Sequence, residues 1–429
     1  MKDTPSLPHS WLRRVSDYHS GGVSEAERAA VEAHLVVCAQ CQQALAAYRR
    51  FYTLARSPVR LSAGGEEAWA PYRPFSEEET MTTTDLDREH GPTRTPYCQP
   101  PIPRKTLGAI AAVLMLTLLA ASLLTYFRSS PPGPAAGQVS EFRLRTADSF
   151  PTGITRGPDG NLWFTEYIGN RIGRITPTGR VTEFPLPTTN SAPQGITRGP
   201  DGNFWFTETD ANQIGRITVA GTLTEYPVPM ANSNPRGITA GPDGALWFTE
   251  ANAAGNSQIG RITVAGTIRE FPLPTYDAPW DITAGPDGAL WFTEGNGIGR
   301  ITPSGQIRHF TLFPSQPTNT AGITVGPDGN LWFTEGATHK IGRITTAGQI
   351  TEYLLPTGSV PQGITRGPDG NLWFIESLGN QIGRITLSGQ ITEYSMPTAN
   401  SSAFGITSGP DGALWFTEQG SNQIGRITV

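Results

Sequence analysis

The sequence predicts a multidomain protein with a small all-α head, one transmembrane helix and an all-β propeller of seven blades. Three observations support this prediction. Histidine and cysteine recur at helical spacing near the start of the chain, and an uncharged apolar run occupies residues 106–127. From residue 139 to residue 429, a unit of about 42 residues is repeated seven times.

The composition restricts the class of protein before any motif is considered. The 429 residues include 49 glycines and 37 prolines, which indicates many tight turns and argues against an all-helical fold. The formal net charge is -5, so the chain lacks the basic excess that nucleic-acid binding usually needs. Only 3 cysteines occur, all in the first quarter of the chain. We therefore expect neither a nucleic-acid partner nor a disulfide scaffold.

Residues 1–60 are expected to form the head. Ser24 and Glu27 have the spacing of a capping box and open a run rich in alanine, glutamate and leucine, which predicts a helix. On this helix His34, Cys38 and Cys41 stand at positions i, i+4 and i+7. One imidazole and two thiolates on one helix face suit a tetrahedral zinc ion. The alternative is a helix with two incidental cysteines.

A structural zinc site needs a fourth ligand, and two upstream histidines are available, His9 and His19. Residues 9–41, HSWLRRVSDYHSGGVSEAERAAVEAHLVVCAQC, resemble the zinc-binding anti-sigma domain, with its H-x3-C-x2-C pattern. The resemblance implies that His9 completes the ligand set. It also implies that the head binds an extracytoplasmic-function sigma factor through the bundle and a helix at residues 42–56. The alternative for that helix is that its aromatic residues only cover the bundle.

Residues 61–105 are rich in proline, threonine and glutamate and are expected to form a flexible linker, in which Cys98 has no assigned role. Residues 106–127 carry no charge and would extend roughly 33 Å as a helix, enough for a bilayer core of about 30 Å. The alternative is a buried soluble helix. Because thiolates persist in the reducing cytosol, we place the N-terminus inside and the propeller outside. With the anti-sigma resemblance, this predicts a single-pass protein of the bacterial cytoplasmic (inner) membrane.

After a spacer at residues 128–138, the repeated unit occupies residues 139–429. A period near 40 to 45 residues is typical of four-stranded propeller blades. Each copy predicts an inner GIT strand, a Pro-Asp-Gly turn, an LWFTE strand, an IGRIT strand and an outer ITEYPLP strand. The last copy lacks its outer strand, and residues 139–144 match it, so we expect them to close the ring. The phrase GITxGPDGxLWFTE begins at Gly153, Gly195, Gly237, Asp281, Gly322, Gly363 and Gly405.

Charged residues that recur in every copy are expected to be architectural. The turn aspartates suit a Pro-Asp-Gly turn for backbone reasons; they are Asp159, Asp201, Asp243, Asp287, Asp328, Asp369 and Asp411. We expect ion pairs between the glutamate that ends each LWFTE strand and the arginine of IGRIT. These residues are Glu166, Glu208, Glu250, Glu294, Glu335, Glu376 and Glu418, with Arg174, Arg216, Arg261, Arg300, Arg343, Arg384 and Arg426. One or two of the glutamates are also candidates to line the mouth of the propeller.

Positions that differ among the copies are better candidates for function, because specificity on a repeated scaffold comes from what varies. The residue just before each inner GIT strand differs in nearly every copy. The candidate ligand-face residues are Gln194, Arg236, Trp280, Gln362 and Phe404, in a ring with Thr152 and Ala321. The fourth copy departs most, with Tyr276, Trp280 and Asp281 where other copies have small residues and glycine. The alternative is drift at a tolerant position.

The repeats over residues 139–429 resemble those of the streptogramin (virginiamycin B) lyases, in GITxGPDGNLWFTE, NxIGRIT and ITEYPLP. The resemblance implies a seven-bladed propeller that opens a cyclic lactone by elimination with magnesium. It also implies histidines just before the inner strands of the sixth and seventh blades and a glutamate two residues before the second of them. Those positions hold Gln362, Phe404 and Ser402 in this chain. Since histidine is the usual general base, the likeness predicts the fold more strongly than the activity.

Three residues remain as catalytic candidates. Glu335 and His339 are expected near the mouth of the fifth blade, and Glu418 matches an acidic position of the lyases. The other histidine after residue 138 is His309, on a predicted outer strand.

The segments together favour a membrane-anchored anti-sigma-like regulator, whose head binds a sigma factor and whose propeller binds an unidentified extracytoplasmic ligand or partner. The second hypothesis is a membrane-anchored lyase, for which magnesium would be the cofactor. The third is that the propeller is a docking scaffold for a protein or for the cell wall.

Overall fold

The computed structural model describes Arg28 and residues 136–429, except 253–254, 275–277 and 313–317. The predicted zinc ligands His9, His34, Cys38 and Cys41 lie outside the described residues, as do the linker at 61–105 and the apolar run at 106–127. In the described part of the chain, no helix is long and apolar enough to cross a membrane.

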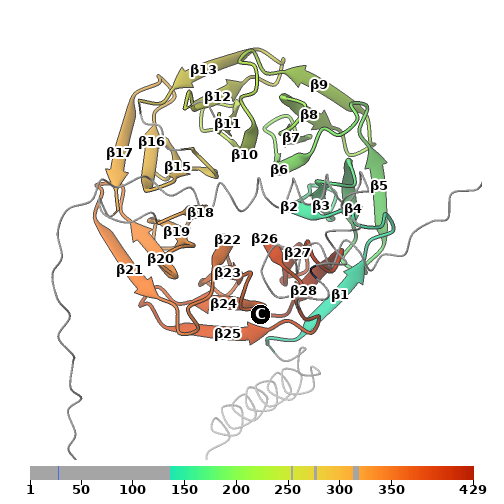
Figure 1. Cartoon of the computed structure of the whole chain (residues 1–429), viewed down its shortest axis with the longest axis vertical. Coiled ribbons are helices and arrows are strands. Elements are labelled where there is room, and N and C mark those ends of the chain that lie inside the picture. Colours follow the sequence, from blue (N-terminus) through green and yellow to red (C-terminus); the bar gives the residue numbers. More distant parts are fainter. Residues whose placement is uncertain (1–27, 29–135, 253–254, 275–277, 313–317) are drawn as a thin grey trace, which may run out of the picture. The chain divides into compact units, whose positions relative to one another are not determined.

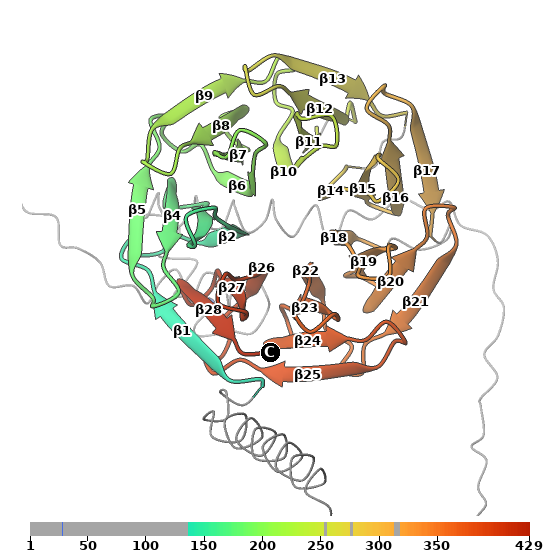
Figure 2. The ribbon, with the colours of Figure 1, turned by 180° about the vertical axis from the view of Figure 1, so that it is seen from behind.

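Residues 139–429 form seven four-stranded antiparallel sheets arranged around a central axis (Figures 1 and 2). The innermost strands are β2 (Pro151–Arg156), β6 (Pro193–Arg198), β10 (Pro235–Ala240), β14 (Ile282–Ala284), β18 (Thr320–Val325), β22 (Pro361–Arg366) and β26 (Ala403–Ser408). The second strands are β3 (Leu162–Glu166), β7 (Phe204–Glu208), β11 (Leu246–Glu250), β15 (Leu290–Glu294), β19 (Leu331–Glu335), β23 (Leu372–Glu376) and β27 (Leu414–Glu418). The third strands are β4 (Arg171–Ile175), β8 (Gln213–Ile217), β12 (Gln258–Ile262), β16 (Gly297–Ile301), β20 (Lys340–Ile344), β24 (Gln381–Ile385) and β28 (Gln423–Ile427). The outer strands are β5 (Val181–Pro185), β9 (Leu223–Pro227), β13 (Ile268–Pro272), β17 (Ile307–Thr311), β21 (Ile350–Leu354), β25 (Ile391–Ser395) and β1 (Val139–Arg143).

The ring closes through strand β1, which is the first of the propeller in sequence and completes the seventh blade. The sheet order is β1-β28-β27-β26, and Val139 pairs with Ile427 in antiparallel register. The backbone of Thr428 extends the seam, because its amide donates to Gln138 O at 3.0 Å and its carbonyl accepts from Gly137 N at 2.8 Å. The predicted closure by residues 139–144 is confirmed.

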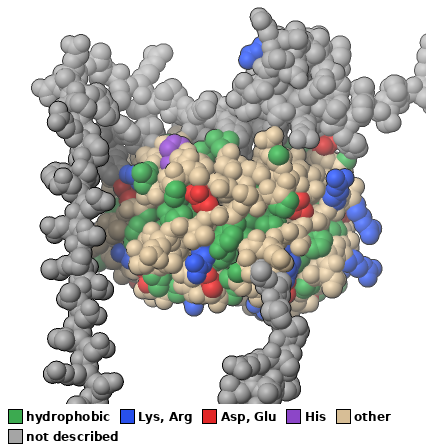
Figure 3. Space-filling model, turned by 90° about the horizontal axis from the view of Figure 1, so that it is seen from below, with side chains coloured by type: hydrophobic (Ala, Val, Ile, Leu, Met, Phe, Trp, Pro, Cys, Tyr) green, Lys and Arg blue, Asp and Glu red, His purple; other side chains and the backbone are tan. Residues whose placement is uncertain are grey.

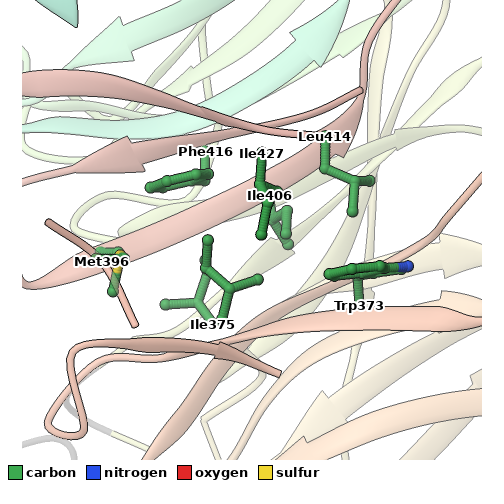
Figure 4. Packing of buried hydrophobic residues seen from close by; sticks show 9 residues of the cluster. Trp373, Ile375, Met396, Ile406, Leu414, Phe416 and Ile427 are labelled. Carbon is green, nitrogen blue, oxygen red and sulfur yellow. The ribbon is translucent and has the colours of Figure 1, made fainter. Parts of the chain in front are cut away.

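The core lies between neighbouring blades rather than inside any single one. Each LWFTE strand buries its tryptophan, and all seven of these side chains are at most 1% exposed. In the cluster drawn in Figure 4, Trp373 of blade six packs with Ile406, Leu414 and Phe416 of blade seven. A single sheet buries little alone, so each blade needs its neighbours to complete its core.

The turn aspartates have the structural role that the sequence predicts. In blade two, Trp205 Nε1 donates to Asp201 Oδ1 at 3.0 Å, and Arg216 Nε donates to Asp201 Oδ2 at 2.9 Å. The same arginine lies over the tryptophan ring, 5.7 Å from its centroid. Equivalent Arg–Asp pairs at 2.6–2.7 Å occur in blades three, four, six and seven. In these five blades the Pro-Asp-Gly turn is thereby joined to the second and third strands.

The expected ion pairs between the LWFTE glutamates and the IGRIT arginines are therefore wrong. The strand register explains the error: Trp205 pairs with Arg216, whereas Glu208 pairs with Gln213 at the opposite end of the hairpin. The arginine thus lies beside the turn aspartate and away from the glutamate.

A threonine in the second strand joins adjacent blades near the axis. In blade one, Thr165 Oγ1 accepts from Gly153 N at 2.8 Å and donates to Gln194 O of blade two at 2.7 Å. In blades two, three, four, five and seven, the equivalent threonine also donates to a backbone carbonyl of the next blade. These residues are Thr207, Thr249, Thr293, Thr334 and Thr417. Blade six has Ile375 at this position, which joins the apolar core instead. These bonds fix the carbonyls of the axial ring.

Candidate ligand pocket on the propeller axis

A pocket of about 160 Å³ lies on the axis, where the seven inner strands converge. Its lining contains all seven ring positions that the sequence singled out: Thr152, Gln194, Arg236, Trp280, Ala321, Gln362 and Phe404. Beyond them lies a ring of six glycines and Asp281, and then five isoleucines, Ile154, Ile196, Ile238, Ile364 and Ile406. The volume is below the roughly 300–1,000 Å³ of pockets for drug-sized ligands, so a small ligand or one arm of a larger ligand fits the space.

The glycine ring is required because the inner strands approach each other so closely. A Cβ added at Gly195 would lie 2.3 Å from Arg236 O, and one at Gly153 would lie 2.4 Å from Gln194 O. No side chain can be accommodated at such distances without moving the neighbouring backbone. The ring of variable residues is therefore held in place by a steric constraint one position farther along each strand.

Blade four breaks this pattern, because Asp281 replaces the ring glycine. Its inner strand, β14, has 3 residues, whereas the other inner strands have 6. Asp281 Oδ1 accepts from its neighbour Ile282 N at 2.9 Å, and Oδ2 accepts from Ile323 N of blade five at 3.1 Å. The carboxylate thus joins blades four and five at the position where the other blades have a glycine. Burial raises its pKa to about 6, against the opposing effect of these two amides. Tyr276 lies outside the described residues.

Arg236 is the only basic side chain that lines this pocket among the described residues. It is 6% exposed, and its guanidinium lies over the ring of Trp280, 4.4 Å from the centroid. Desolvation lowers its pKa to about 10, against an opposing effect of Tyr167. No carboxylate of the described residues forms an ion pair with it. Burying a guanidinium without an anion raises the free energy of the folded state, so Arg236 is a candidate for ligand binding.

The glutamine next to Arg236 in the ring is oriented by a neighbour. The hydroxyl of Thr209 is a donor shared between Gln194 Oε1 at 3.2 Å and Pro235 O at 2.7 Å. With its oxygen against this hydroxyl, the amide of Gln194 keeps its two N–H donors for the pocket. Gln194 is 8% exposed. Sequence reasoning missed Thr209, and the available signal was that only blade two carries a threonine after its LWFTE strand.

The LWFTE glutamates end the second strands beside the start of the inner strands, but none of them lines the pocket. They are buried, and in six blades each faces the glutamate of an outer strand. Burial, together with Glu183, raises the pKa of Glu166 to about 8, and burial with Glu270 raises that of Glu250 to about 8. In blade four the outer strand instead provides His309, whose Nδ1 lies 2.7 Å from Glu294 Oε2. The glutamate in ITEYPLP is the sequence signal for these pairs.

The three catalytic candidates do not form a site together. Glu335 accepts a hydrogen bond from Thr338 at 2.7 Å, and its pKa is raised to about 7, chiefly by burial. His339 Nδ1 lies 2.9 Å from Ser359 O, whereas the hydroxyl bonded to Glu335 is that of Thr338. Glu418 accepts from Ser421 at 2.7 Å, and burial raises its pKa to about 7. None of the three lines the axial pocket.

The pocket does not offer a magnesium site. Its one carboxylate, Asp281, has both oxygens bound to backbone amides, and Ser402 stands where the family resemblance implies a glutamate. Within the described residues, no group of three or more histidine, cysteine, aspartate or glutamate side chains could hold a metal ion. Hard cations need several oxygen ligands, so these donors do not fit the metal.

Figure 3 shows one side of the propeller, on which basic, acidic and apolar side chains are interspersed. This side presents no continuous basic surface of the kind that binds a phosphate backbone.

Comparison with known proteins agrees with the sequence in both the head and the propeller. A zinc-finger family matches residues 9–42, and the virginiamycin B lyase family matches residues 134–313 and 253–429.

The virginiamycin B lyase of Staphylococcus aureus is 44% identical over 68% of this chain and 99% of its own, with a TM-score of 0.64. Its catalytically inactive histidine-to-alanine variant, solved with quinupristin, gives the same values. A streptogramin B lyase structure is 43% identical over 69% and 99% of the two chains, with a TM-score of 0.65. No curated protein matches. The chain belongs to the virginiamycin B lyase family.

Proposed function

We propose that this protein is a membrane-anchored regulator, in which the head binds an extracytoplasmic-function sigma factor and the propeller binds a small ligand in its axial pocket. The observation that carries the propeller's part is the composition of the ring. It combines one buried cation, two amides and two aromatic rings, but no imidazole. Such a lining suits recognition of a ligand better than removal of a proton.

The lyase hypothesis is the second candidate, and family membership favours it. A histidine-to-alanine variant of the S. aureus enzyme is described as catalytically inactive. The two ring positions at which the family resemblance implies histidines hold Gln362 and Phe404. Neither side chain can accept a proton near neutral pH, and general-base catalysis contributes about 100-fold to 10,000-fold.

We therefore expect the purified full-length chain to linearise quinupristin at least about 100-fold more slowly than the S. aureus enzyme at equal concentration with magnesium. Mass spectrometry of the ring-opened product measures this rate. Product formation that is abolished in His339→Ala or Glu418→Ala would promote the lyase hypothesis and refute ours.

The head's part of the proposal rests on the zinc-finger match to residues 9–42. Within that range His9, His34, Cys38 and Cys41 provide one nitrogen or sulfur ligand each, which completes a tetrahedral site. The uncharged run at 106–127 would anchor the chain in the cytoplasmic membrane with the propeller outside. Protease added to spheroplasts should then digest the propeller and spare the head, and the reverse pattern would refute this arrangement.

The full-length chain should contain one zinc ion, and the sigma factor should co-purify with it from the native host. Loss of a thiolate ligand removes much of the binding free energy, so Cys38→Ser and Cys41→Ser should each lose both zinc and sigma factor. The matched control is Cys98→Ser, which removes a cysteine of the predicted linker and should change neither. Metal analysis and mass spectrometry of the co-purified proteins provide the two measurements. Full zinc retention in both ligand variants would contradict the site.

A further inference from the structure

We propose that the axial pocket binds an organic monocarboxylate, with the carboxylate on Arg236 and the apolar part against Trp280 and the isoleucine floor. The inference rests on the proposed ligand-binding role and deepens it, because it names the chemical class of the ligand.

The first argument is the state of Arg236. Arg236 is 6% exposed, and its guanidinium lies over the ring of Trp280, 4.4 Å from the centroid, with no ion pair to a carboxylate among the described residues. An aromatic face attracts the guanidinium but leaves its in-plane N–H groups without acceptors. Those N–H groups form a planar fork that matches the two oxygens of a carboxylate. A bound carboxylate would therefore complete the interactions of a cation that the described residues leave without an anion.

The second argument is the set of donors around Arg236. Gln194, in the adjacent blade, has its oxygen against Thr209 and so presents N–H groups to the pocket. Two neighbouring blades thus provide hydrogen-bond donors, which suits an acceptor-only ligand group.

The third argument concerns charge and shape, which select among anions. Asp281 also lines the pocket, but each of its oxygens accepts from a backbone amide, and no ion pair joins it to Arg236 within the described residues. One guanidinium near a carboxyl group favours a singly charged ligand over a dianionic phosphate. The floor is isoleucine, and the rim includes Trp280 and Phe404. These surfaces suit a compact apolar or aromatic group attached to the carboxylate.

The test uses the purified full-length chain and benzoate, with benzamide as the neutral molecule of the same shape. Isothermal titration should detect benzoate and show benzamide to bind at least about 10-fold more weakly. N-acetylphenylalanine and its amide form a second pair that mimics a peptide C-terminus. Stronger binding in the first pair indicates a free small acid as the ligand, and stronger binding in the second pair indicates a peptide end.

Arg236→Gln should weaken benzoate binding by about 10- to 100-fold, because it removes the charged donor. The matched control is Arg198→Gln, which removes an exposed arginine from the far end of β6 in the neighbouring blade. It should leave the affinity unchanged. Without ligand, the melting temperature of Arg236→Met should equal or exceed that of the native chain. The reason is that the substitution removes a buried cation that has no anion, and with it the cost of desolvating that charge. A raised melting temperature with lost binding separates a ligand-binding residue from a structural one.

Three outcomes of the titrations would overturn the inference. They are equal affinity for benzoate and benzamide, an undiminished affinity in Arg236→Gln, and no binding of either acid at about 10 mM, well above the ~1 mM dissociation constant of a weak ligand. Tighter binding of inorganic phosphate than of both acids would also overturn it. The quinupristin and sigma-factor assays, and not carboxylate binding, decide the proposed regulatory role, so the two failures are distinguishable.

Discussion

Gly195→Ala should destabilise the propeller by about 3 kcal/mol or more, because the ring leaves no room for a methyl group at this position. The new Cβ would lie 2.3 Å from Arg236 O and 3.2 Å from Ile238 N, both of which are backbone atoms of blade three. A flexible side chain could move aside, but a backbone held by the Thr207 hydrogen bond cannot do so without disturbing the ring. For a propeller of this size, a loss of about 3 kcal/mol lowers the melting temperature by roughly 6–12 °C. Calorimetry or thermal circular dichroism measures it.

Gly202→Ala provides the matched control in the same blade. Gly202 lies in the Pro-Asp-Gly turn with φ of 77°, and a Cβ there would meet no atom within 4 Å. Alanine at this position adds only the backbone strain of the left-handed conformation, which should lower the free energy of unfolding by about 1–2 kcal/mol. The steric argument for the ring fails if both variants unfold at the same temperature.

Folding should be more stable at pH 5.5 than at pH 8.5, with a melting temperature roughly 5–10 °C higher. The cause is the buried carboxyl pairs between second and outer strands. Burial and the facing Glu225 raise the pKa of Glu208 to about 7, and the values for Glu166 and Glu250 rise to about 8. A carboxyl whose pKa is higher in the folded than in the unfolded chain stabilises the fold fully below the unfolded value of about 4.5. This stabilisation falls progressively as the pH rises from there through the folded values of about 7 to 8.

Glu250→Gln tests the assignment, because an amide has the same shape and cannot ionise. It should raise the melting temperature at pH 8.5 and leave it nearly unchanged at pH 5.5. Glu294→Gln is the matched control in blade four, where His309 takes the place of the facing glutamate. This variant loses a favourable contact and should not be stabilised at pH 8.5. A propeller whose melting temperature rises steadily from pH 5.5 to pH 8.5 would show that these pairs do not control its stability.

The propeller and its closure could be predicted because both follow from repetition of short local patterns. The match of VSEFRL to the outer strand of other copies predicts the pairing of Val139 with Ile427 without knowledge of the intervening chain. The predicted ion pairs are wrong for a local reason. The register of the hairpin between the second and third strands places Arg216 opposite Trp205 and beside Asp201. The prediction considered only which charged residues recur in each copy, and recurrence does not reveal this register. The sequence interpretation of the zinc head and of the apolar run remains a prediction.

The ring positions were also predictable, since they vary where the rest of the unit is constant. The orientation and the partners of these side chains could not be predicted, because they depend on contacts between copies. The orientation of Gln194 depends on Thr209, and the stacking of Arg236 depends on Trp280 in the next blade. The hydrogen bond from Ile323 to Asp281 crosses between blades four and five. Sequence spacing does not reveal such contacts when their members are about 15 to 44 residues apart.

The seam between β1 and β28 also imposes an order on biosynthesis. Gln138 and Thr428, which are bonded across that seam, lie 290 residues apart in the chain. During translation β1 emerges first, and its partner emerges about 290 residues later. At the roughly 5–20 residues per second of synthesis, β1 waits some 15–60 s as an unpaired edge. The newly made chain therefore passes through an open arc of blades, and during this interval it is most exposed to chaperones, proteases and pairing with other chains.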